Sequence, residues 1–456
     1  MMSEISLPAA LSKLPEDAPE AVVSATFFVP HVLEELGFSQ SNGEVIPEFD
    51  TGKGAADYAV RKNIGDDIFL HTRNNPYMIC ELKGRDINLE EGSAQYKRAV
   101  QQLHKKYLLA PKCRSAKWGL LTNSCHIQLF RKHNKVIHPA TPCLEISPET
   151  IDTVIETIRQ KIENPIKALT VAIYNNKGGV GKTTTTVNLA SILALAKKRV
   201  LVVDFDPNQQ DLTSALGIPL SNGQVYTALD DRDADIRDAI QRYVPPLKKI
   251  AENDLGFDIL PADKVLVHDI DESDLRQKWK KHTLHRKLAE LKDAYDYILI
   301  DSPPNWRIFS QQALYAAEVV LTPTKHNNLF SLENAVSVIR DFIPEVQSMK
   351  GDATPIALPI FFNGGKITPY QLQEAQKALI EMIKQAKKIQ SERPKFDLQP
   401  YFFPRYTNAR KDLHIFQLPS YANIANAAFA RIPAVYRDKS AREYYISLAK
   451  EYFLHG

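Results

Sequence analysis

The sequence is poor in cysteine and contains no long apolar run. Its four cysteines, Cys80, Cys113, Cys125 and Cys143, lie far apart, and none belongs to a CxxC pair. That spacing argues against a zinc site and a disulfide framework, and it is typical of a reducing cytoplasm. No apolar run approaches the ~20 residues of a membrane span, and the N-terminus lacks the basic start and apolar core of a signal peptide. We therefore expect a cytoplasmic protein with no membrane partner.

Net charge is also scarce, at only +3 over 456 residues, so any affinity for nucleic acid must come from local patches. One such patch stands out, because residues 93–138 contain ten Lys or Arg and no Asp or Glu. This imbalance favours a surface for a phosphate backbone. A face that merely increases solubility would have the same composition.

Length and composition predict a folded protein of two or three domains, at about 150 residues per domain. The chain is 44% hydrophobic and 24% charged, which is typical of soluble globular proteins. Prolines interrupt residues 139–148, an amphipathic helical pattern follows at 149–163, and Pro165 ends it. The expected division is an N-terminal tail at 1–21, a smaller domain at 22–138, a linker with a helix at 139–168 and a larger domain at 169–456.

A glycine-rich stretch at 177–184 lies between an apolar, strand-like run at 169–174 and a helical pattern at 187–197. The amides of such a turn converge on an anion, and the helix dipole adds to the attraction. Lys182 is expected to reach terminal phosphates, and the Thr183 hydroxyl to bind Mg²⁺. Asn176 occupies the usual first glycine position, and an additional lysine, Lys177, follows it. The stretch predicts a nucleotide site.

Apolar runs alternate with helical patterns after this loop, which predicts an α/β fold with a doubly wound, mostly parallel sheet. In such a sheet the ligand lies at the carboxyl ends of the strands. Asp204, Asp206 and Asp301 follow two of the runs. A single Asp after a strand is more often a helix cap, but three after a phosphate loop favour a metal and catalytic role. The predicted strands are residues 200–204, 257–260, 297–301, 319–323, 356–362 and 401–403.

These motifs resemble the ParA/MinD family of ATPases with a deviant Walker A loop, over about residues 169–456. The resemblance implies ATP and Mg²⁺ as cofactors and an ATP-dependent homodimer, in which Lys177 reaches the partner's phosphates. Asp206 would position the attacking water, and Asp301 would support the metal together with Thr183 and Asp206. Asn363 would contact adenine. The nucleotide-binding set that it implies is Lys177, Gly178, Gly179, Val180, Gly181, Lys182, Thr183, Thr184 and Asn363.

The resemblance also implies non-specific DNA binding and an adaptor of the ParB or cargo type, with an association with the nucleoid in the cytoplasm. Arg405, Arg410 and Lys411 fall where ParA proteins carry surface cations for DNA, although ordinary solvated charges would look the same. MinD-like relatives end in a basic amphipathic helix that binds membranes. The last helical stretch here holds Arg442, Lys450 and two glutamates, so its charge is balanced and membrane attachment by this route is not expected.

A second candidate site lies in the smaller domain. Residues 77–83 (YMICELK) form a strand-like run on which Glu81 and Lys83 point to the same face. An aspartate from the neighbouring strand, Asp57, would complete a carboxylate pair for Mg²⁺, an ion that prefers hard oxygen ligands and can activate water. Lys83 would supply a charge near the attacking water or the phosphate. The D…ExK spacing alone is a weak pattern that often arises by chance.

The order of features resembles the N-terminal PD-(D/E)xK nuclease domain of type I restriction enzyme R subunits, over about residues 22–133. The segments that carry the resemblance are VLEELGF, GAADYAV with Asp57, ICELKGRD, AVQQLHKKY and the hairpin GLLTNSCHIQLF. That family often has Gln and Tyr one helical turn apart on the helix. Gln102 and Tyr107 are five residues apart, so only Gln102 is carried over. The resemblance implies an α/β restriction-endonuclease-like domain that binds or cuts DNA.

The sequence thus leaves three functions open. The first is a ParA-like ATPase in DNA or cargo partition, with an appended Mg²⁺-dependent nuclease or DNA-binding domain. The second is a nuclease effector of a restriction or defence system that the ATPase regulates. The third is an interaction module in which both sites are inactive, which the intact motifs disfavour.

Overall fold

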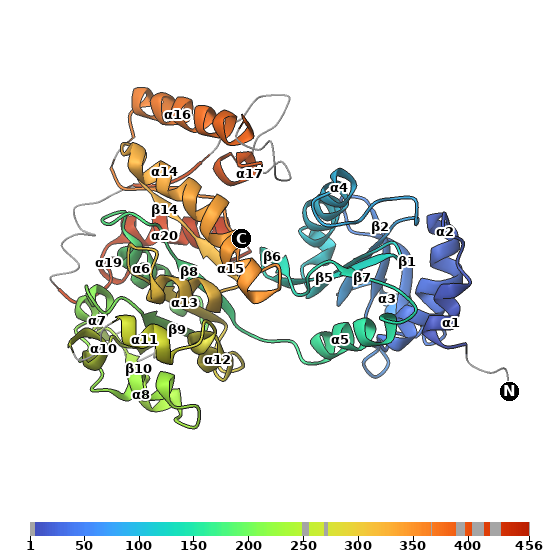
Figure 1. The fold of residues 1–456 in the computed structure, drawn as a ribbon, viewed down its shortest axis with the longest axis horizontal. Helices are drawn as coiled ribbons and strands as arrows, with labels where there is room; N and C mark the ends of the chain where they lie inside the picture. Colours follow the sequence, from blue (N-terminus) through green and yellow to red (C-terminus); the bar gives the residue numbers. More distant parts are fainter. Residues whose placement is uncertain are drawn as a thin grey trace. The chain divides into compact units, whose positions relative to one another are not determined.

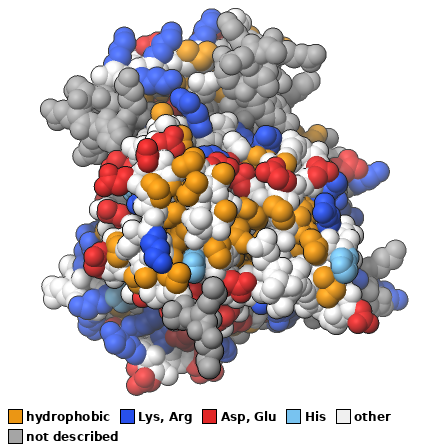
Figure 2. Space-filling model, turned by 90° about the vertical axis from the view of Figure 1, so that its right-hand side faces the viewer, with side chains coloured by type: hydrophobic (Ala, Val, Ile, Leu, Met, Phe, Trp, Pro, Cys, Tyr) orange, Lys and Arg blue, Asp and Glu red, His pale blue; other side chains and the backbone are white. Residues whose placement is uncertain are grey.

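The computed structural model describes residues 5–248, 255–268, 272–365, 367–388, 397–403, 415–419 and 430–455 (Figure 1). The chain divides into two compact units, residues 1–166 (unit 1) and 167–454 (unit 2). Within the described residues, no helix has both the length and the apolar character that crossing a bilayer requires. Figure 2 shows one face of the molecule, on which hydrophobic side chains gather in the middle and charges of both signs surround them. That mixture agrees with the small net charge.

Unit 1 is built on a mixed sheet in the order β1-β2-β3-β4-β5-β6, with β7 paired to β5. Only β3 and β4 are parallel to each other; the other pairs are antiparallel. The strands are β1 (Val45–Asp50), β2 (Ala55–Val60), β3 (Met78–Leu82), β4 (Trp118–Thr122), β5 (His126–His133), β6 (Val136–Pro139) and β7 (Leu144–Glu145). The expected hairpin at the end of the domain is β4 and β5.

Alternating side chains of β3 enter two different cores. Met78, Cys80 and Leu82 pack with α1 (Leu7–Ser12), the π-helical segment η1 (Ser24–Leu33) and α5 (Ile151–Glu163). Ile79 packs on the opposite face with α4 (Ala94–Gln101) and the π-helical segment η2 (Gln102–Leu108). Glu81 shares the period of Ile79, so it faces η2. Three short helices complete the unit: α2 (Glu20–Val23), α3 (Phe69–Thr72) and η3 (Pro111–Cys113).

The structure corrects two expectations about the ends of this unit. Residues 5–21 are not a loose tail, because Leu7, Ala10 and Leu11 are spaced for one helix face and are buried in the core. Residues 139–163 are not simply a linker, because α5 buries Ile151, Ile155 and other apolar residues in the same core. The remaining predicted domain bounds stay predictions.

A buried histidine in η2 gives unit 1 a specific sensitivity to acid. The His104 ring packs edge-on against Phe130 at 4.6 Å, and its Nε2 is buried. Burial, with His138 and Lys105, lowers the pKa of His104 to about 3. Between pH 6.5 and this value the unfolded chain binds a proton at His104 that the folded chain does not, so stability falls as pH falls.

We expect the free energy of unfolding to drop by about 2 kcal/mol more in wild type than in His104→Gln between pH 7 and pH 5. Urea titrations at the two pH values measure this difference, with glutamine as the neutral side chain at both. Equal pH slopes for the two proteins would show that His104 is solvated or already protonated in the folded state.

Unit 2 contains a sheet in the order β10-β11-β9-β12-β8-β13-β15, in which only β10 is antiparallel (Figure 1). The predicted doubly wound, mostly parallel sheet is therefore confirmed. Three of the strands have the predicted bounds: β9 (Val200–Asp204), β11 (Phe257–Leu260) and β12 (Tyr297–Asp301). The others are β8 (Leu169–Ile173), β10 (Gln241–Tyr243), β13 (Val319–Leu321) and β15 (Ile356–Ala357).

Helices cover both faces of this sheet. One set, α8, α11, α12 and α13, packs against Leu201, Val203, Ile298 and Ile300, while α6, α19 and α20 pack together and α6 also contacts β9 and β12. The bounds are α6 (Lys182–Leu195), α7 (Asp211–Leu216), α8 (Gln224–Asp230), η4 (Ile236–Ala239), α10 (Lys264–His268), α11 (Glu272–Lys278), α12 (Thr283–Ala289), α13 (Ile308–Ala316), α19 (Ala434–Arg437) and α20 (Lys439–Tyr452).

A second, three-stranded parallel sheet takes the order β14 (Pro323–Thr324), β16 (Phe361–Asn363) and β17 (Phe416–Leu418). The expected single strands at 319–323 and 356–362 are thus each divided between two sheets. The expected strand at 401–403 is wrong: α17 (Gln399–Phe402) begins with Pro400 in its first turn, and Asp397 Oδ1 accepts the Gln399 amide there. Nearby lie α14 (Leu329–Ser337), η5 (Val338–Phe342), α15 (Ile343–Lys350) and α16 (Pro369–Lys388).

Candidate functional site

The glycine-rich loop connects the carboxyl end of β8 to the first residue of α6, Lys182. Gly179 and Gly181 have φ values of 70° and 87°, a region that other residues rarely adopt. A Cβ at Gly181 would also lie 2.2 Å from Asn363 Nδ2, whereas the space around Gly179 is open. Gly178 is exposed, Val180 is buried, and Thr183 and Thr184 lie in the first turn of α6. The loop therefore leaves its backbone open to a ligand at a helix N-terminus.

Lys182, Thr183 and Asp301 meet where this loop faces the end of β12. Thr183 Oγ1 donates a hydrogen bond of 2.6 Å to Asp301 Oδ2, and Lys182 Nζ donates to the Lys177 carbonyl at 3.3 Å. Burial raises the pKa of Asp301, an effect that Thr183 opposes and Asp204 reinforces. Burial lowers the pKa of Lys182, while Asp301 and Asp206 oppose the shift. A cation and a carboxylate are thus held in a site with little water, where a bound polyanion and its metal would stabilise both charges.

Asp204, the last residue of β9, and Asp206, two residues later, have different hydrogen-bond partners. Asp204 Oδ2 accepts hydrogen bonds from the Thr213 amide at 2.8 Å and the Thr213 hydroxyl at 2.6 Å, so it fixes the start of α7. Asp206 Oδ1 accepts only longer bonds of 3.2 Å from the amides of Asn208 and Gln209. Burial raises the pKa of Asp206, although those amides and Lys182 oppose the shift. Asp206 acts electrostatically on Lys182, although Asp301 acts on it more strongly.

Asn363, at the end of β16, supports the loop directly. Its Nδ2 donates to the Val180 carbonyl at 2.8 Å, so the three-stranded sheet is tied to the glycine-rich turn. A second anchor, Asn175, was not predicted: its buried Nδ2 donates to the Pro323 carbonyl at 2.9 Å. The position of Asn175 directly after the apolar run at 169–174 was the only sign of this role in the sequence. Arg405, Arg410 and Lys411 lie outside the described residues.

The residues around Thr183 fit Mg²⁺. Among the described residues, no group of three or more His, Cys, Asp or Glu forms a ready metal cage. Mg²⁺ does not require one, since it keeps several waters and binds substrate phosphates through one or two protein oxygens. Asp301 Oδ1 is buried and has no hydrogen-bond partner among the described residues. The Thr183 hydroxyl and this unpaired carboxylate oxygen are the hard ligands that such an ion takes.

In unit 1, Asp57, Glu81 and Lys83 come together as the sequence predicted. Tyr58 pairs with Cys80, so Asp57 on β2 lies opposite Glu81 on β3. Lys83 Nζ lies 2.5 Å from Glu81 Oε1 and 3.9 Å from Asp57 Oδ2, and it also donates to the Leu82 carbonyl. Asp57 Oδ2 accepts the Leu82 amide at 2.6 Å. Two carboxylates and one cation therefore lie together on the neighbouring strands β2 and β3 and the residue after β3.

Electrostatics set these carboxylates apart from ordinary surface residues. Glu81 is fully buried, and burial together with Asp57 raises its pKa to about 7, against the effect of Lys83. Burial also raises the pKa of Asp57. Glu81 Oε2 is buried without a hydrogen-bond partner in the described part of the chain. The raised pKa values of Glu81 and Asp57 favour a proton on these carboxylates when no cation is bound. A divalent cation bound to the unpaired oxygen of Glu81 would take the place of that proton.

The five-residue spacing of Gln102 and Tyr107 has a structural cause. Both lie in η2, a π-helical segment in which residues five apart fall on one face. Gln102 Nε2 donates to Glu81 Oε1 and to the Tyr107 hydroxyl, both at 2.8 Å. Tyr107 is therefore linked to Glu81 through Gln102, whereas the sequence prediction, which assumes a helical period of 3.6, carries over Gln102 alone. The eight residues of α-helix before η2 give no sequence signal for this change of period.

Sequence reasoning also missed Glu20. This first residue of α2 places its Oε2 3.7 Å from Lys83 Nζ, and its side chain is 46% exposed. Burial and Asp57 raise the pKa of Glu20, while Lys83 opposes the shift. The sequence predicts a tail over residues 1–21, so it gives no reason to expect Glu20 near Lys83.

The basic stretch at 93–138 is a surface only in part. Seven of its ten cations are exposed. Lys132 is instead buried, and its Nζ donates to the carbonyls of Cys113 at 2.6 Å and Arg114 at 3.2 Å. Burial lowers its pKa to about 8. The Arg131 guanidinium lies over the Trp118 ring at 4.8 Å. Two of the ten cations therefore stabilise unit 1 itself.

Comparison with known proteins gives matches for unit 2. A family model described as an AAA domain matches residues 168–353. The chromosome-partitioning ATPase Soj of Treponema pallidum (strain Nichols) is 37% identical over 193 residues, which cover 42% of this chain and 70% of that protein. The sporulation initiation inhibitor protein Soj of Bacillus subtilis (strain 168) is 41% identical over 158 residues, which cover 34% of this chain and 57% of that protein.

Two further matches have lower sequence identity and cover different fractions of this chain. The chromosome partitioning protein ParA of Myxococcus xanthus (strain DK1622) is 33% identical over 216 residues, covering 45% of this chain and 70% of that protein. Among solved structures, the septum site-determining protein MinD of Pyrococcus horikoshii OT3 is 23% identical with a TM-score of 0.42, over 62% of this chain and 95% of that one. The assignment of this chain to a protein family therefore depends on the sequence matches and not on this structural comparison.

Proposed function

Because this chain belongs to the ParA family of ATPases, we propose that it is a switch that dimerises on ATP, binds DNA without sequence preference and releases it after hydrolysis. The observation that carries the proposal is the cluster of Lys182, Thr183 and Asp301 at the N-terminus of α6. Its cargo would be DNA or an assembly that moves on DNA, by analogy with the chromosome-partitioning relatives. A ParB-like or cargo adaptor would stimulate release, and the nucleoid would be the site of action in the cytoplasm.

In the proposed reaction, each residue has a role that its position supports. The loop amides and Lys182 hold the terminal phosphates, and Lys177 reaches those of the partner subunit. Thr183 and Asp301 would hold Mg²⁺, and this ion would supply positive charge next to the phosphates. Asp206 accepts a hydrogen bond from the attacking water and orients it toward the γ-phosphate. Asn363 keeps the loop in shape through Val180 as well as lying where the family contacts adenine.

For unit 1 we propose a DNA-binding domain with Mg²⁺-dependent nuclease activity. The pairing of β2 with β3 sets the carboxylates of Asp57 and Glu81 opposite each other, next to Lys83. Asp57 and Glu81 would hold Mg²⁺, and Lys83 would orient the attacking water or stabilise the phosphate charge. Gln102 and Tyr107 fix the Glu81 carboxylate through the bond from Gln102. The exposed cations of residues 93–117 would contact the DNA backbone.

We expect Lys83→Ala to lower Mg²⁺-dependent cleavage of plasmid DNA by at least about 100-fold, because one preorganised charge is worth roughly 3 kcal/mol in a site of this kind. Lys83 Nζ lies 2.5 Å from Glu81, 3.7 Å from Glu20 and 3.9 Å from Asp57, and alanine removes this cation from all three carboxylates. Lys161→Ala, which removes an exposed lysine of α5 in the same unit and outside the basic stretch, is the control and should cut at the wild-type rate. If wild type and Lys83→Ala leave plasmid equally intact with every nucleotide, unit 1 binds DNA without cutting it.

The second candidate function is a nuclease effector of a restriction or defence system that unit 2 regulates. The unusual burial of Glu81 beside Lys83 favours it, because a purely DNA-binding surface has no need of a buried carboxylate. The two functions differ in the dependence of cleavage on nucleotide. An effector should cut only in one nucleotide state, and this dependence should disappear with Lys182→Ala. A partition ATPase should cut, if it cuts, at a rate that ATP does not change.

A further inference from the structure

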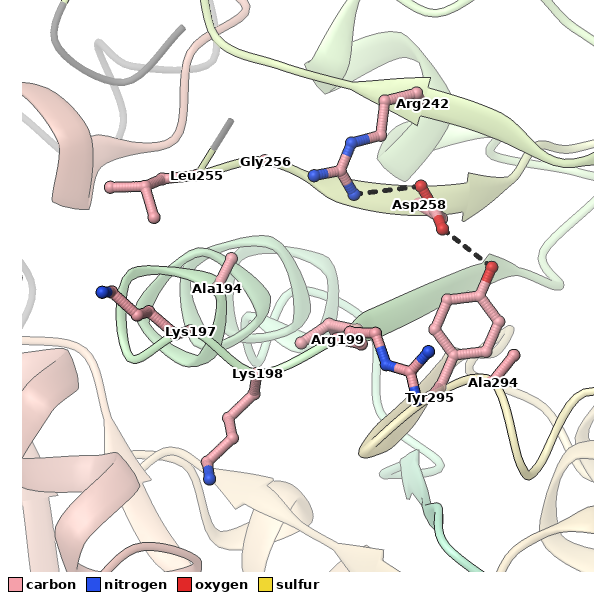
Figure 3. Close-up of a pocket in the computed structure, with 11 residues that line it drawn as sticks. Ala194, Lys197, Lys198, Arg199, Arg242, Leu255, Gly256, Asp258, Ala294 and Tyr295 are labelled. Carbon is pink, nitrogen blue, oxygen red and sulfur yellow. Dashed lines mark hydrogen bonds and ion pairs between the residues drawn. The ribbon is translucent and has the colours of Figure 1, made fainter. Parts of the chain in front are cut away.

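A cavity of about 760 Å³ lies in unit 2 at the amino ends of the sheet strands (Figure 3). Lys197 and Lys198 come from the turn after α6, and Arg199 precedes β9. Arg242 comes from β10, and Asp258 from β11. The cavity is thus lined by residues of the segments 194–200, 255–258 and 294–295 and by Arg242, and by none of the residues assigned to the ATP site.

The cavity and the phosphate loop are at opposite ends of the same elements. The α6 helix begins with Lys182 at the loop and has 14 residues, so its far end is about 20 Å away at 1.5 Å per residue. Strand β9 likewise starts at the cavity with Val200 and ends at Asp204 beside the ATP site. A ligand in this cavity would therefore not touch the phosphate loop.

The charge of the lining is strongly positive. Among the described residues of the lining, four side chains are cationic and Asp258 is the one carboxylate. That carboxylate is already bound, since Arg242 Nη1 lies 3.1 Å from its Oδ1 and the Tyr295 hydroxyl donates to Oδ2 at 2.8 Å (Figure 3). Arg199 uses one guanidinium nitrogen on the Asp293 carbonyl at 3.3 Å, and a guanidinium has five N–H donors. The lining can therefore bind further anionic oxygens.

The lining also has an apolar part. Ala194, Val200, Leu255, Ala294 and the ring of Tyr295 contribute to it, and Figure 3 shows Ala194 and Leu255 on the side away from Asp258. A volume of this size falls in the range of pockets for small molecules, about 300–1,000 Å³. A duplex backbone is bound by raised or shallow surfaces and does not need such a hollow. Shape and charge together favour a small anion with an organic part.

We propose that this cavity binds a small ligand that carries two or more phosphate groups, such as a nucleoside polyphosphate, at a site separate from the ATP site. Lys197 and Arg199 bind its phosphates, and the apolar wall at Ala194 and Leu255 receives the remainder. The inference does not depend on the proposed switch or on the nuclease.

The test uses the full chain with Lys182→Ala, which removes the main phosphate ligand of the ATP site. Isothermal titration with inorganic triphosphate, without Mg²⁺, measures the affinity of the cavity. We expect the added pair Lys197→Gln and Arg199→Gln to weaken binding at least tenfold. The pair Arg437→Gln and Lys439→Gln, which removes the same charges from exposed positions of unit 2, should change the affinity less than twofold.

Two results would overturn the proposal: no binding of triphosphate by the Lys182→Ala protein, or equal weakening by the two pairs. A twelve-nucleotide single-stranded DNA serves as the second probe. If the cavity pair weakens binding of that strand but not of triphosphate, the cations contact a nucleic-acid backbone and the small-ligand site is wrong. Melting curves check that the pair is folded, and Lys197→Gln alone replaces it if it is not, with a weakening of at least threefold expected.

Discussion

Replacing Lys182 by alanine is expected to abolish ATP turnover and to weaken ATP binding at least about 100-fold. The ammonium is 8% exposed and lies in the field of Asp301 and Asp206. Two charge-assisted hydrogen bonds to phosphate oxygens are worth about 3 kcal/mol or more in such a site, and alanine removes both. Titration with a fluorescent ATP analogue and an assay of phosphate release measure the two effects.

The matched control is Lys439→Ala, which removes an 89% exposed lysine from the same unit. It should bind and hydrolyse ATP at the wild-type level. Wild-type turnover in Lys182→Ala would place ATP elsewhere in the chain and would contradict the assignment of the loop.

Asp206→Ala is expected to separate binding from hydrolysis. Turnover should fall at least about 100-fold, because the water that attacks the γ-phosphate loses its positioning partner. Binding should stay within a few-fold of wild type, because Asp206 makes no bond to Lys182 or Thr183 and its own partners are the amides of Asn208 and Gln209. Asp211→Ala removes an exposed carboxylate of the next helix and is the control. Equal loss of binding and turnover in Asp206→Ala would assign it to phosphate binding instead.

Asp204→Ala should behave differently from both. Its carboxylate holds the Thr213 amide and hydroxyl, so alanine leaves buried donors unpaired and destabilises the start of α7. The contrast shows why the sequence could place both aspartates at the strand end but could not divide their roles. The different roles depend on Thr213, which lies nine residues after Asp204 in the sequence and donates two hydrogen bonds to it in the fold. No local sequence pattern predicts this contact.

The central strands of unit 2 could be predicted to the residue, because a parallel strand buried on both faces is a continuous apolar run. Strands β9, β11 and β12 have that character. The same rule fails at the edges. The β10 strand is a three-residue antiparallel pair to β11, and β17 joins a sheet whose other members are two or three residues long. Tertiary contacts, and not local pattern, decide such short pairings.

The site in unit 1 could be predicted for the residues that lie on strands and not for those on helices. Asp57, Glu81 and Lys83 follow from a period of two and from one strand pairing. Tyr107 depends on a π-helical turn, and Glu20 on a short N-terminal helix that packs back on the core. In the ATP site, the loop and its aspartates were likewise visible, while the support from Asn175 depends on distant chain segments.

The central claim is that ATP at the loop joins two copies of the chain, and sedimentation velocity of Asp206→Ala tests it most directly. Because this variant should bind ATP without hydrolysing it, the bound state should persist through the run. The account predicts a monomer without nucleotide or with ADP, and a dimer with Mg²⁺ and saturating ATP. The additional change Lys177→Ala should restore the monomer. A monomeric Asp206→Ala protein at saturating ATP, with binding confirmed in the same sample, would contradict the dimer switch.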